Sequence, residues 1–258
     1  NPSVETLLHA FLPHTFVDHT HATAFLALAN LPDAEAAIAE IFGDRVAAVP
    51  YIMPGFALAK KAAEIFEADP TVEGLVLLNH GHFTFGETAK QSYDRVIDHT
   101  NRVEAWLADR AGGRTFGTSV HTVRVPENAE RATQVLPVLR GVLGAIRSDH
   151  HGAAMPMPVF DVRGGPAVHA FLGRDDLASL SRRGVGSPDH VIRTKGFPLH
   201  LTRADVDGGE AAIRAATERW ADAYRTYFET NNERVGGIKT MLEPIPGLAW
   251  IEGVGLVG

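Results

Sequence analysis

Residues 72–82 read Val-Glu-Gly-Leu-Val-Leu-Leu-Asn-His-Gly-His, a nearly continuous apolar run that ends in two histidines separated by a glycine. Apolar runs of this length are typical of strands that are covered on both faces of a sheet. Ligand sites in α/β sheets gather where such strands end, and Gly81 permits a tight turn there. The run therefore predicts a buried strand over 72–78, with His80 and His82 following its carboxyl end.

Helix and strand patterns alternate on both sides of this strand. In the N-terminal half, the apolar periodicity predicts helices over 3–12, 22–29, 34–42, 56–68 and 86–110, and strands over 15–21 and 45–50. In the C-terminal half, it predicts helices over 126–147, 175–183 and 209–230, and strands near 159–162, 168–172 and 248–251. Such alternation places the chain in the α/β class.

The pair Gly112-Gly113 follows the long helix and suits a left-handed helix cap. We place a domain boundary there, which gives a metal-binding domain over 1–112 and a second α/β domain over 113–258.

The bulk composition excludes several classes of protein. The chain has 258 residues, 31 acidic against 24 basic side chains, a net charge of −7 and no cysteine. Without a basic cluster, a nucleic acid partner is not expected. Without cysteine, disulfides and thiolate metal sites are excluded, and we expect a cytoplasmic protein. No apolar run approaches the roughly 18 residues needed to cross a bilayer, so no membrane association is expected.

His19-Thr20-His21 is the first candidate for chemistry. In a strand, residues i and i+2 point to the same face, so these two imidazoles could share one cation. The alternative is a pair of half-exposed histidines at a strand end. A third imidazole from His80 or His82, which spacing alone does not distinguish, would give the three-histidine set of a catalytic zinc site.

Three ordered segments resemble the motifs of the class II aldolase/adducin family, over about residues 1–110. The segments are Asn1-Pro2-Ser3-Val4-Glu5, Val17-Asp18-His19-Thr20-His21-Ala22, and Leu77-Leu78-Asn79-His80-Gly81 with Gly86. The resemblance implies a three-layer α/β/α domain with a mixed sheet, followed by a smaller α/β domain. It also implies that His19, His21 and His80 hold Zn²⁺ or another divalent metal, because the family ligand is the histidine directly before glycine.

The resemblance assigns two further roles. Glu5 corresponds to the catalytic carboxylate, whose pKa we expect burial beside the substrate to raise. The alternative for Glu5 is a solvated glutamate in a first helical turn. Tyr51, ahead of Pro54-Gly55, resembles the tyrosine that family aldolases lend across a subunit interface as proton donor, which implies a homotetramer. Its alternative is a tyrosine that packs at a strand end.

The segments 187–198 and 242–256 resemble the aldolase portion of bifunctional rhamnulose-phosphate aldolase/short-chain alcohol dehydrogenase proteins. In those proteins a dehydrogenase domain follows. Because this chain begins at Asn1 rather than methionine and stops just after a strand-like run, we expect it to be truncated at both ends. Arg193 and Lys195, together with a His190 oriented by Asp189, could bind an anion. A helix start with Ser187 as cap and Pro188 in first position is the alternative for this segment.

The activity that the resemblance implies is cleavage of a ketose 1-phosphate, such as rhamnulose 1-phosphate, to dihydroxyacetone phosphate and an aldehyde. The cation would stabilise an enediolate, and Glu5 would shuttle the proton. In the family, the glycine-rich loops that hold the sugar phosphate precede the part that begins here with Asn1. The alternatives are a sugar-phosphate 4-epimerase with the same metal site and an adducin-like interaction module, for which loss of the metal histidines would be expected.

Two motifs are rejected. Gly253-Val254-Gly255-Leu256-Val257-Gly258 fits the dinucleotide pattern, but that pattern requires a following helix that this chain does not contain. Asp149-His150-His151-Gly152 resembles a metal-binding tract, but we expect a solvated loop after a helix.

Overall fold

The structure is a computed structural model that describes residue 3, residues 5–112 and residues 128–258. The chain forms two compact units, one of Asn1–Thr115 with Gly186–His190 and one of Phe116–Val185 with Val191–Gly258. Each unit contains a four-stranded mixed sheet, which confirms the α/β class. The predictions made at Asn1, Pro2, Val4 and Gly113, and those for residues 114–127, lie outside the described residues.

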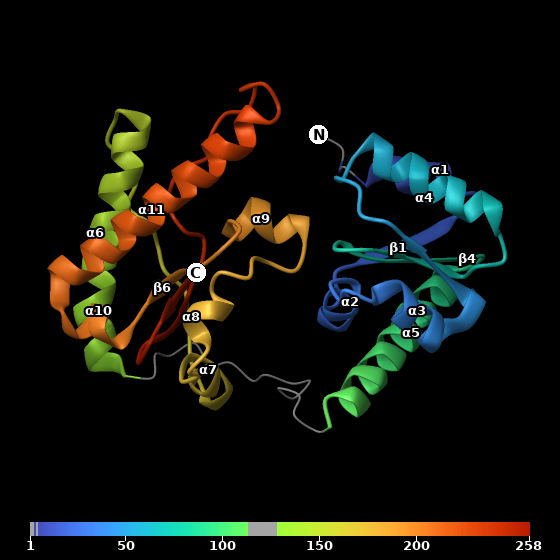
Figure 1. The fold of residues 1–258 in the computed structure, drawn as a ribbon, viewed down its shortest axis with the longest axis horizontal. Coiled ribbons are helices and arrows are strands. Elements are labelled where there is room, and N and C mark those ends of the chain that lie inside the picture. The colour runs from blue at the N-terminus through green and yellow to red at the C-terminus, as the bar shows by residue number, and fades with distance from the viewer. Residues whose placement is uncertain (1–2, 4, 113–127) are drawn as a thin grey trace. The chain divides into compact units, whose positions relative to one another are not determined.

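The first unit is a three-layer α/β/α sandwich. Its strands are β1 (Phe16–Thr20), β2 (Val46–Val49), β3 (Gly74–Leu77) and β4 (Gly81–Gly86), in the order β1-β4-β3-β2. Strands β2 and β3 are parallel, and the other two pairings are antiparallel. One face is covered by α1 (Thr6–Phe11) and α4 (Phe56–Ala68), and the other by α2 (Thr23–Ala29), α3 (Ala34–Phe42) and α5 (Ala89–Arg110) (Figure 1).

Strand β3 explains the continuous apolar run, because its alternate side chains enter two different cores. Leu75 and Leu77 pack in the cluster that includes α1 and α4, while Val76 packs with side chains of α2, α3 and α5. All three are essentially fully buried. Each such burial stabilises the fold by roughly 1.5–3 kcal/mol. Because its side chains enter both cores, β3 packs against the helix layers on both faces of the sheet.

The segment after His80 corrects the sequence prediction. Residues 81–86 form β4, which pairs with both β1 and β3, whereas the sequence placed a turn and a helix start there. Helix α5 begins at Ala89 rather than at residue 86, because the Thr88 side chain caps it by accepting from the Gln91 amide at 3.1 Å.

The second unit has a sheet in the order β5-β8-β7-β6, with only β6 and β7 parallel. Its strands are β5 (Val162–Arg163), β6 (Leu199–Leu201), β7 (Ala249–Ile251) and β8 (Gly255–Val257). Its helices are α6 (Ala129–His151), α7 (Pro166–Leu172), α8 (Leu177–Leu180), α10 (Arg203–Asp207) and α11 (Gly209–Glu233), and α9 (Pro188–Thr194) begins within the residues grouped with the first unit. Side chains of α6 and α11 bury the sheet in one core.

Two predictions in this unit are wrong. Residues 168–172 form helix α7, not a strand, because Gly165 and Pro166 start a helix there. His150 and His151 lie in the last turn of α6 rather than in a loop, and His151 Nε2 bonds Glu243 at 2.7 Å. Within the rejected dinucleotide pattern, Gly255–Val257 forms strand β8 of the sheet.

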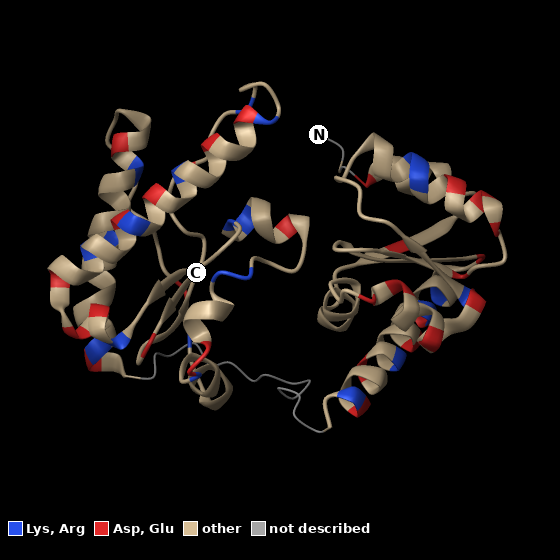
Figure 2. Ribbon diagram, viewed as in Figure 1, with Lys and Arg blue, Asp and Glu red and all other residues tan. Residues whose placement is uncertain are grey.

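Basic and acidic side chains alternate along α4, α5 and α11 (Figure 2). Several form ion pairs one helical turn apart, such as Arg102 with Asp98 and Arg214 with Glu210. None of the described helices is long and apolar enough to cross a membrane.

Candidate metal centre

Three histidines converge at one end of the first unit's sheet. His19 lies in β1, His21 directly beyond its end, and His80 in the turn between β3 and β4. One ring nitrogen from each lies within 4.8 Å of the others, and the Nε2 atoms of His19 and His21 are 3.0 Å apart. The structure thus brings together the three residues that the sequence proposed as ligands.

The turn that presents His80 is tightly specified. Leu77 pairs with Gly81 across the β3–β4 hairpin, and the His80 amide donates to the Leu77 carbonyl at 3.1 Å. Asn79 adopts a positive φ of 57°, which asparagine tolerates better than most residues. Its side chain donates to Asn30 Oδ1 at 2.9 Å, so the turn is anchored to the end of α2.

Gly81 is required by the close approach of the histidines. A Cβ atom at this position would lie 2.6 Å from Cδ2 of His21, 2.8 Å from the Thr20 carbonyl and 3.0 Å from Cε1 of His19. Separations under 3 Å demand movement of the neighbours, and one of these neighbours is backbone. The glycine that identified His80 in the sequence therefore also makes room for the other two rings.

The ring of His19 is held in one orientation. Its Nδ1 lies 3.0 Å from the His82 carbonyl, which can only accept, so Nδ1 carries the proton and Nε2 carries the lone pair, on the side of His21. The ring also stacks on Phe83 at 4.0 Å between centroids. Partners that fix the tautomer in this way commonly accompany metal-binding histidines.

The environment keeps all three imidazoles neutral. Burial lowers the pKa of His19 to about 4, assisted by His21 and His80. Burial also lowers the pKa of His21, against the opposing influence of Asp189 and Glu5, and the pKa of His80, against that of Glu5. Neutral imidazole is the form that binds a metal. The 3.0 Å between the Nε2 atoms of His19 and His21 is close to the roughly 3.3 Å between two nitrogens bound to a tetrahedral zinc. With a His80 nitrogen within 4.8 Å of both, the three residues fit a divalent cation.

Glu5 lies beside this cluster. It precedes α1, and its Oε1 is 3.6 Å from Nε2 of His80. Partial burial raises the pKa of Glu5, but the hydrogen bond from Ser3 and the nearby His19 and His80 outweigh burial and lower it. In the substrate-free protein Glu5 is therefore a carboxylate, whereas the sequence prediction of a raised pKa concerned the complex with substrate.

Tyr51 lies in the loop between β2 and α4 and is 53% exposed. Among the described residues, no hydrogen bond joins it to the histidines. Met53 and Phe56 beside it are also exposed, and Phe56 contacts the exposed Phe11 of α1 at 6.3 Å between ring centroids. We call these four exposed side chains, of which Phe11 and Phe56 are in contact, the Tyr51 patch (Phe11, Tyr51, Met53 and Phe56).

The predicted anion-binding residues are divided between the two units, and their joint role stays a prediction. His190 is grouped with the first unit, and its Nδ1 contacts the Ser187 hydroxyl at 2.8 Å. Arg193 and Lys195 belong to the second unit. Lys195 Nζ lies 5.5 Å from the ring centroid of Tyr224, and burial lowers its pKa against the opposing influence of Glu243. Pro188 starts α9, as the structural alternative for this segment predicted.

A buried polar network behind the site was not predicted. His82 Nε2 lies 3.0 Å from His99 Nδ1, and His99 Nε2 lies 3.6 Å from Glu73, which also pairs with Arg95 at 3.3 Å. Burial lowers the pKa of both histidines. The His82 ring stacks on Phe25 at 3.9 Å and is not among the three converging rings.

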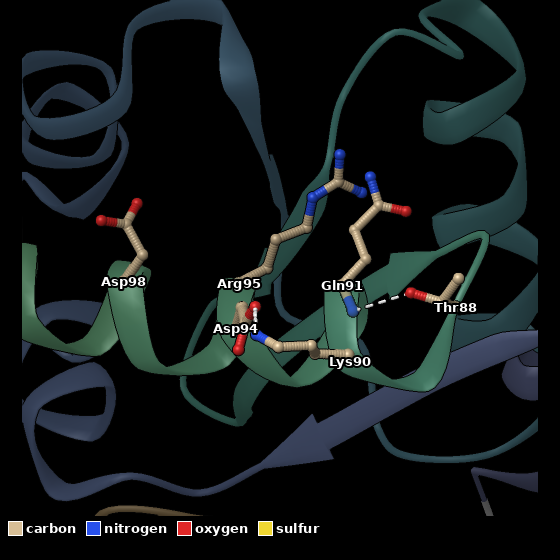
Figure 3. Close-up of a pocket in the computed structure, with 6 residues that line it drawn as sticks. All are labelled: Thr88, Lys90, Gln91, Asp94, Arg95 and Asp98. Atoms are coloured by element: carbon tan, nitrogen blue, oxygen red, sulfur yellow. Dashed lines mark hydrogen bonds and ion pairs between the residues drawn. The ribbon is translucent and has the colours of Figure 1, made fainter.

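A hollow of about 350 Å³ on α5 contains none of these histidines. Figure 3 shows its six lining residues, with Lys90 paired to Asp94 and the Gln91 amide bonded to Thr88. Its remaining charges are also largely paired, since Arg95 reaches Glu73 and Asp98 reaches Arg102. These contacts account for the side chains as parts of a solvated helix surface.

One curated protein is similar to this chain over nearly its whole length. A curated relative, "Uncharacterized oxidoreductase YuxG" of Bacillus subtilis (strain 168), is 30% identical over 262 residues, which is 99% of this chain and 36% of the relative. The chain thus spans about a third of that relative's length.

Two solved structures are similar over part of the chain. The N-terminal class II aldolase domain of a conserved protein from Thermoplasma acidophilum is 47% identical, with a TM-score of 0.38, and the match covers 41% of this chain and 48% of that one. A sugar-phosphate aldolase from Thermotoga maritima is 22% identical, with a TM-score of 0.37, and the match covers 45% and 57% of the two chains.

Two family descriptions match consecutive parts of the chain. Residues 1–107 match "Class II Aldolase and Adducin N-terminal domain", and residues 130–258 match "Aldolase class II, second domain". The second match covers half of the 258 residues, and the first contains all three converging histidines. The chain therefore belongs to the class II aldolase/adducin family.

Proposed function

We propose that this protein is a metal-dependent aldolase that cleaves a ketose 1-phosphate, with rhamnulose 1-phosphate as the substrate to test first. The observation that carries the proposal is the convergence of His19, His21 and His80 in neutral form at a sheet end. An adducin-like interaction module has no need for three imidazoles held at this spacing.

The chain's own residues divide the chemistry between them. His19, His21 and His80 would hold the cation, with the His82 carbonyl fixing the His19 ring. A divalent cation there would polarise the ketose carbonyl and neutralise the negative charge that carbon–carbon cleavage leaves. Glu5, as a carboxylate 3.6 Å from His80, is placed to accept a proton from substrate and return it to carbon.

The identity of the metal and sugar rests on the family resemblance. Three nitrogen ligands with an open position suit Zn²⁺, which is the cation we propose. The YuxG relative is named an oxidoreductase, and 64% of its length lies outside the match. That leaves space for a dehydrogenase domain, which supports the expectation of an aldolase fused to a short-chain dehydrogenase.

We further propose a homo-oligomer, with a tetramer as the expected form. The Tyr51 patch supports it, because groups of exposed large apolar side chains commonly mark association surfaces. An interface there would place Tyr51 against a second copy, where its hydroxyl could serve as proton donor.

The test is product analysis by ¹³C NMR of rhamnulose 1-phosphate incubated with zinc-loaded protein. We expect dihydroxyacetone phosphate and an aldehyde in equal amounts, and no reaction with the His19→Ala variant. Recovery of an epimeric sugar phosphate without fragments would establish the epimerase instead. Retention of intact substrate at full metal loading, with this and other ketose 1-phosphates, would contradict both enzymatic proposals.

A further inference from the structure

The second unit contains a cavity of about 460 Å³ that the proposed aldolase chemistry does not use. Its walls come from the end of α8, from the segment that enters β6, from the start of α10 and from α11. The volume falls within the range of about 300–1,000 Å³ that is usual for small-molecule sites. All lining residues belong to this unit and are separate in sequence from the histidine cluster.

The charged lining is predominantly basic. It comprises Arg182, Arg219 and one carboxylate, that of Asp205. Asp205 is engaged as the capping-box residue of α10, accepting from the amide and hydroxyl of Thr202 at 3.0 and 2.6 Å. It reaches Arg219 only at 3.6 Å. Arg182 has no carboxylate within ion-pair distance among the described residues, so the two guanidiniums retain donors for an anion.

His200 and its carboxylate partner do not change the predominance of positive charge at the cavity. His200 also lines the cavity, and its Nε2 lies 2.9 Å from Glu252. The other Glu252 oxygen accepts from the Arg203 amide at 2.8 Å. Glu252 itself is not part of the lining, and its carboxylate is held by these two partners, which leaves the guanidiniums as the dominant charges at the cavity.

The apolar part of the lining comes from two aromatic rings. Phe197 and Trp220 both line the cavity, and their ring centroids are 5.3 Å apart. Trp220 is only 6% exposed, and its Nε1 has no hydrogen-bond partner among the described residues. Because the Nε1 atom is itself inaccessible to solvent, the Trp220 ring contributes an apolar wall to the cavity rather than a donor.

We propose that this cavity binds a small organic anion. A phosphate or carboxylate group would bond to Arg182 and Arg219, and an apolar body would lie against Phe197 and Trp220. Both headgroups present the planar or tetrahedral oxygens that guanidinium donors match.

The test is isothermal titration calorimetry on the whole protein after metal removal with EDTA, so that a cation at the histidines cannot bind the probes. Phenyl phosphate and benzoate each combine an anion with a ring, while inorganic phosphate and benzyl alcohol supply one half each. We expect one saturable site for phenyl phosphate or benzoate, and the tighter of the two identifies the headgroup. Each half-probe should bind at least about tenfold more weakly.

Variants locate the binding. Arg182→Gln with Arg219→Gln should weaken binding at least about tenfold. Ala223→Phe should weaken it by filling part of the cavity without changing charge. The matched control, Arg214→Gln with Arg225→Gln, removes two arginines of α11 that do not line the cavity. Absence of saturable binding by both ring-bearing anions, or equal affinities in the two arginine pairs, would overturn the proposal. Because the protein is metal-free, either result is independent of the aldolase assay.

Discussion

Gly81 is the residue on which the spacing of the three imidazoles depends. It is the first residue of β4, directly after the His80 turn, and a side chain there would meet His21 and the backbone of Thr20. The sequence predicted a tight turn at this glycine, but the close contact with β1 required the pairing of β1 with β4. The proximity of His19 and His21 was predictable from strand periodicity, because residues i and i+2 of a strand lie on the same face.

Gly81→Ala should therefore weaken metal binding while preserving the fold. The added methyl group must displace His21 or β1, and we expect about 10 to 100-fold lower zinc affinity, the usual range when residues that orient ligands are replaced. Competition with a chelating dye measures it. Gly141→Ala in α6, where a Cβ would meet nothing within 4 Å, is the control and should bind zinc normally. Unchanged affinity in Gly81→Ala would mean that the rings need no such clearance.

Glu5→Gln separates two roles for this carboxylate. If Glu5 moves protons, the amide keeps the shape and the metal but loses turnover by about 100 to 10,000-fold. Metal content and the rate of ketose phosphate cleavage are measured on the same sample. Glu67→Gln, an exposed glutamate of α4, should retain both. Cleavage at the unmodified rate would assign Glu5 to the start of α1 alone, and a parallel fall in metal content would make it a ligand.

Strand β4 is the element that the sequence missed and that the site most needs. Residues 81–86 contain glycine at both ends, and so short a segment was not distinguished from a turn leading into α5. Similarly, Val168–Leu172 has a short apolar pattern that fits either a strand or a helix. Helices 34–42 and 56–68 were predicted at their observed bounds, because longer amphipathic patterns are less ambiguous. The His82–His99 contact depends on how β4 packs against α5, which periodicity does not specify.

The contact between His82 and His99 should make strand β4 less stable at acidic pH in the metal-free protein. Burial lowers the pKa of His82 and His99 in the folded state, so the unfolded chain, with ordinary histidine pKa values near 6.5, binds more protons. Their stabilising contribution is complete above about pH 6.5 and is lost as the pH falls below it toward the folded-state values. Hydrogen exchange of the β4 amides, corrected for intrinsic rates, should give a lower opening free energy at pH 5.5 than at pH 7.5. An equal or higher value at pH 5.5 would contradict this reasoning.

At the scale of the whole molecule, the chain joins two α/β units that carry different kinds of candidate site. The first holds the histidine cluster, and the second holds the cavity with Arg182 and Arg219. The sequence identified the first through short motifs with fixed spacing. It could not identify the second, because the cavity is lined by residues scattered over 178–223 that share no motif.

Oligomer formation is tested through the Tyr51 patch. Met53→Glu with Phe56→Glu should raise the dissociation constant of the oligomer by at least about tenfold, because each apolar side chain contributes roughly 1.5–3 kcal/mol when buried. Light scattering over a concentration series measures it. Val159→Glu changes a side chain that is 87% exposed outside the patch and should leave the mass unchanged. A monomeric unmodified protein, or an oligomer indifferent to the double variant, would remove Tyr51 as a donor to a second copy.

Metal content after loading is the most direct measurement of the proposed function. Zinc-loaded protein is dialysed and analysed by mass spectrometry of the metal, with His80→Ala beside His150→Ala, whose histidine lies in α6 outside the cluster. We expect about one zinc per chain in the unmodified protein and in His150→Ala, and a loss of most of it in His80→Ala. No retained metal in the unmodified protein, or equal retention in the two variants, would show that the three imidazoles do not form a metal site.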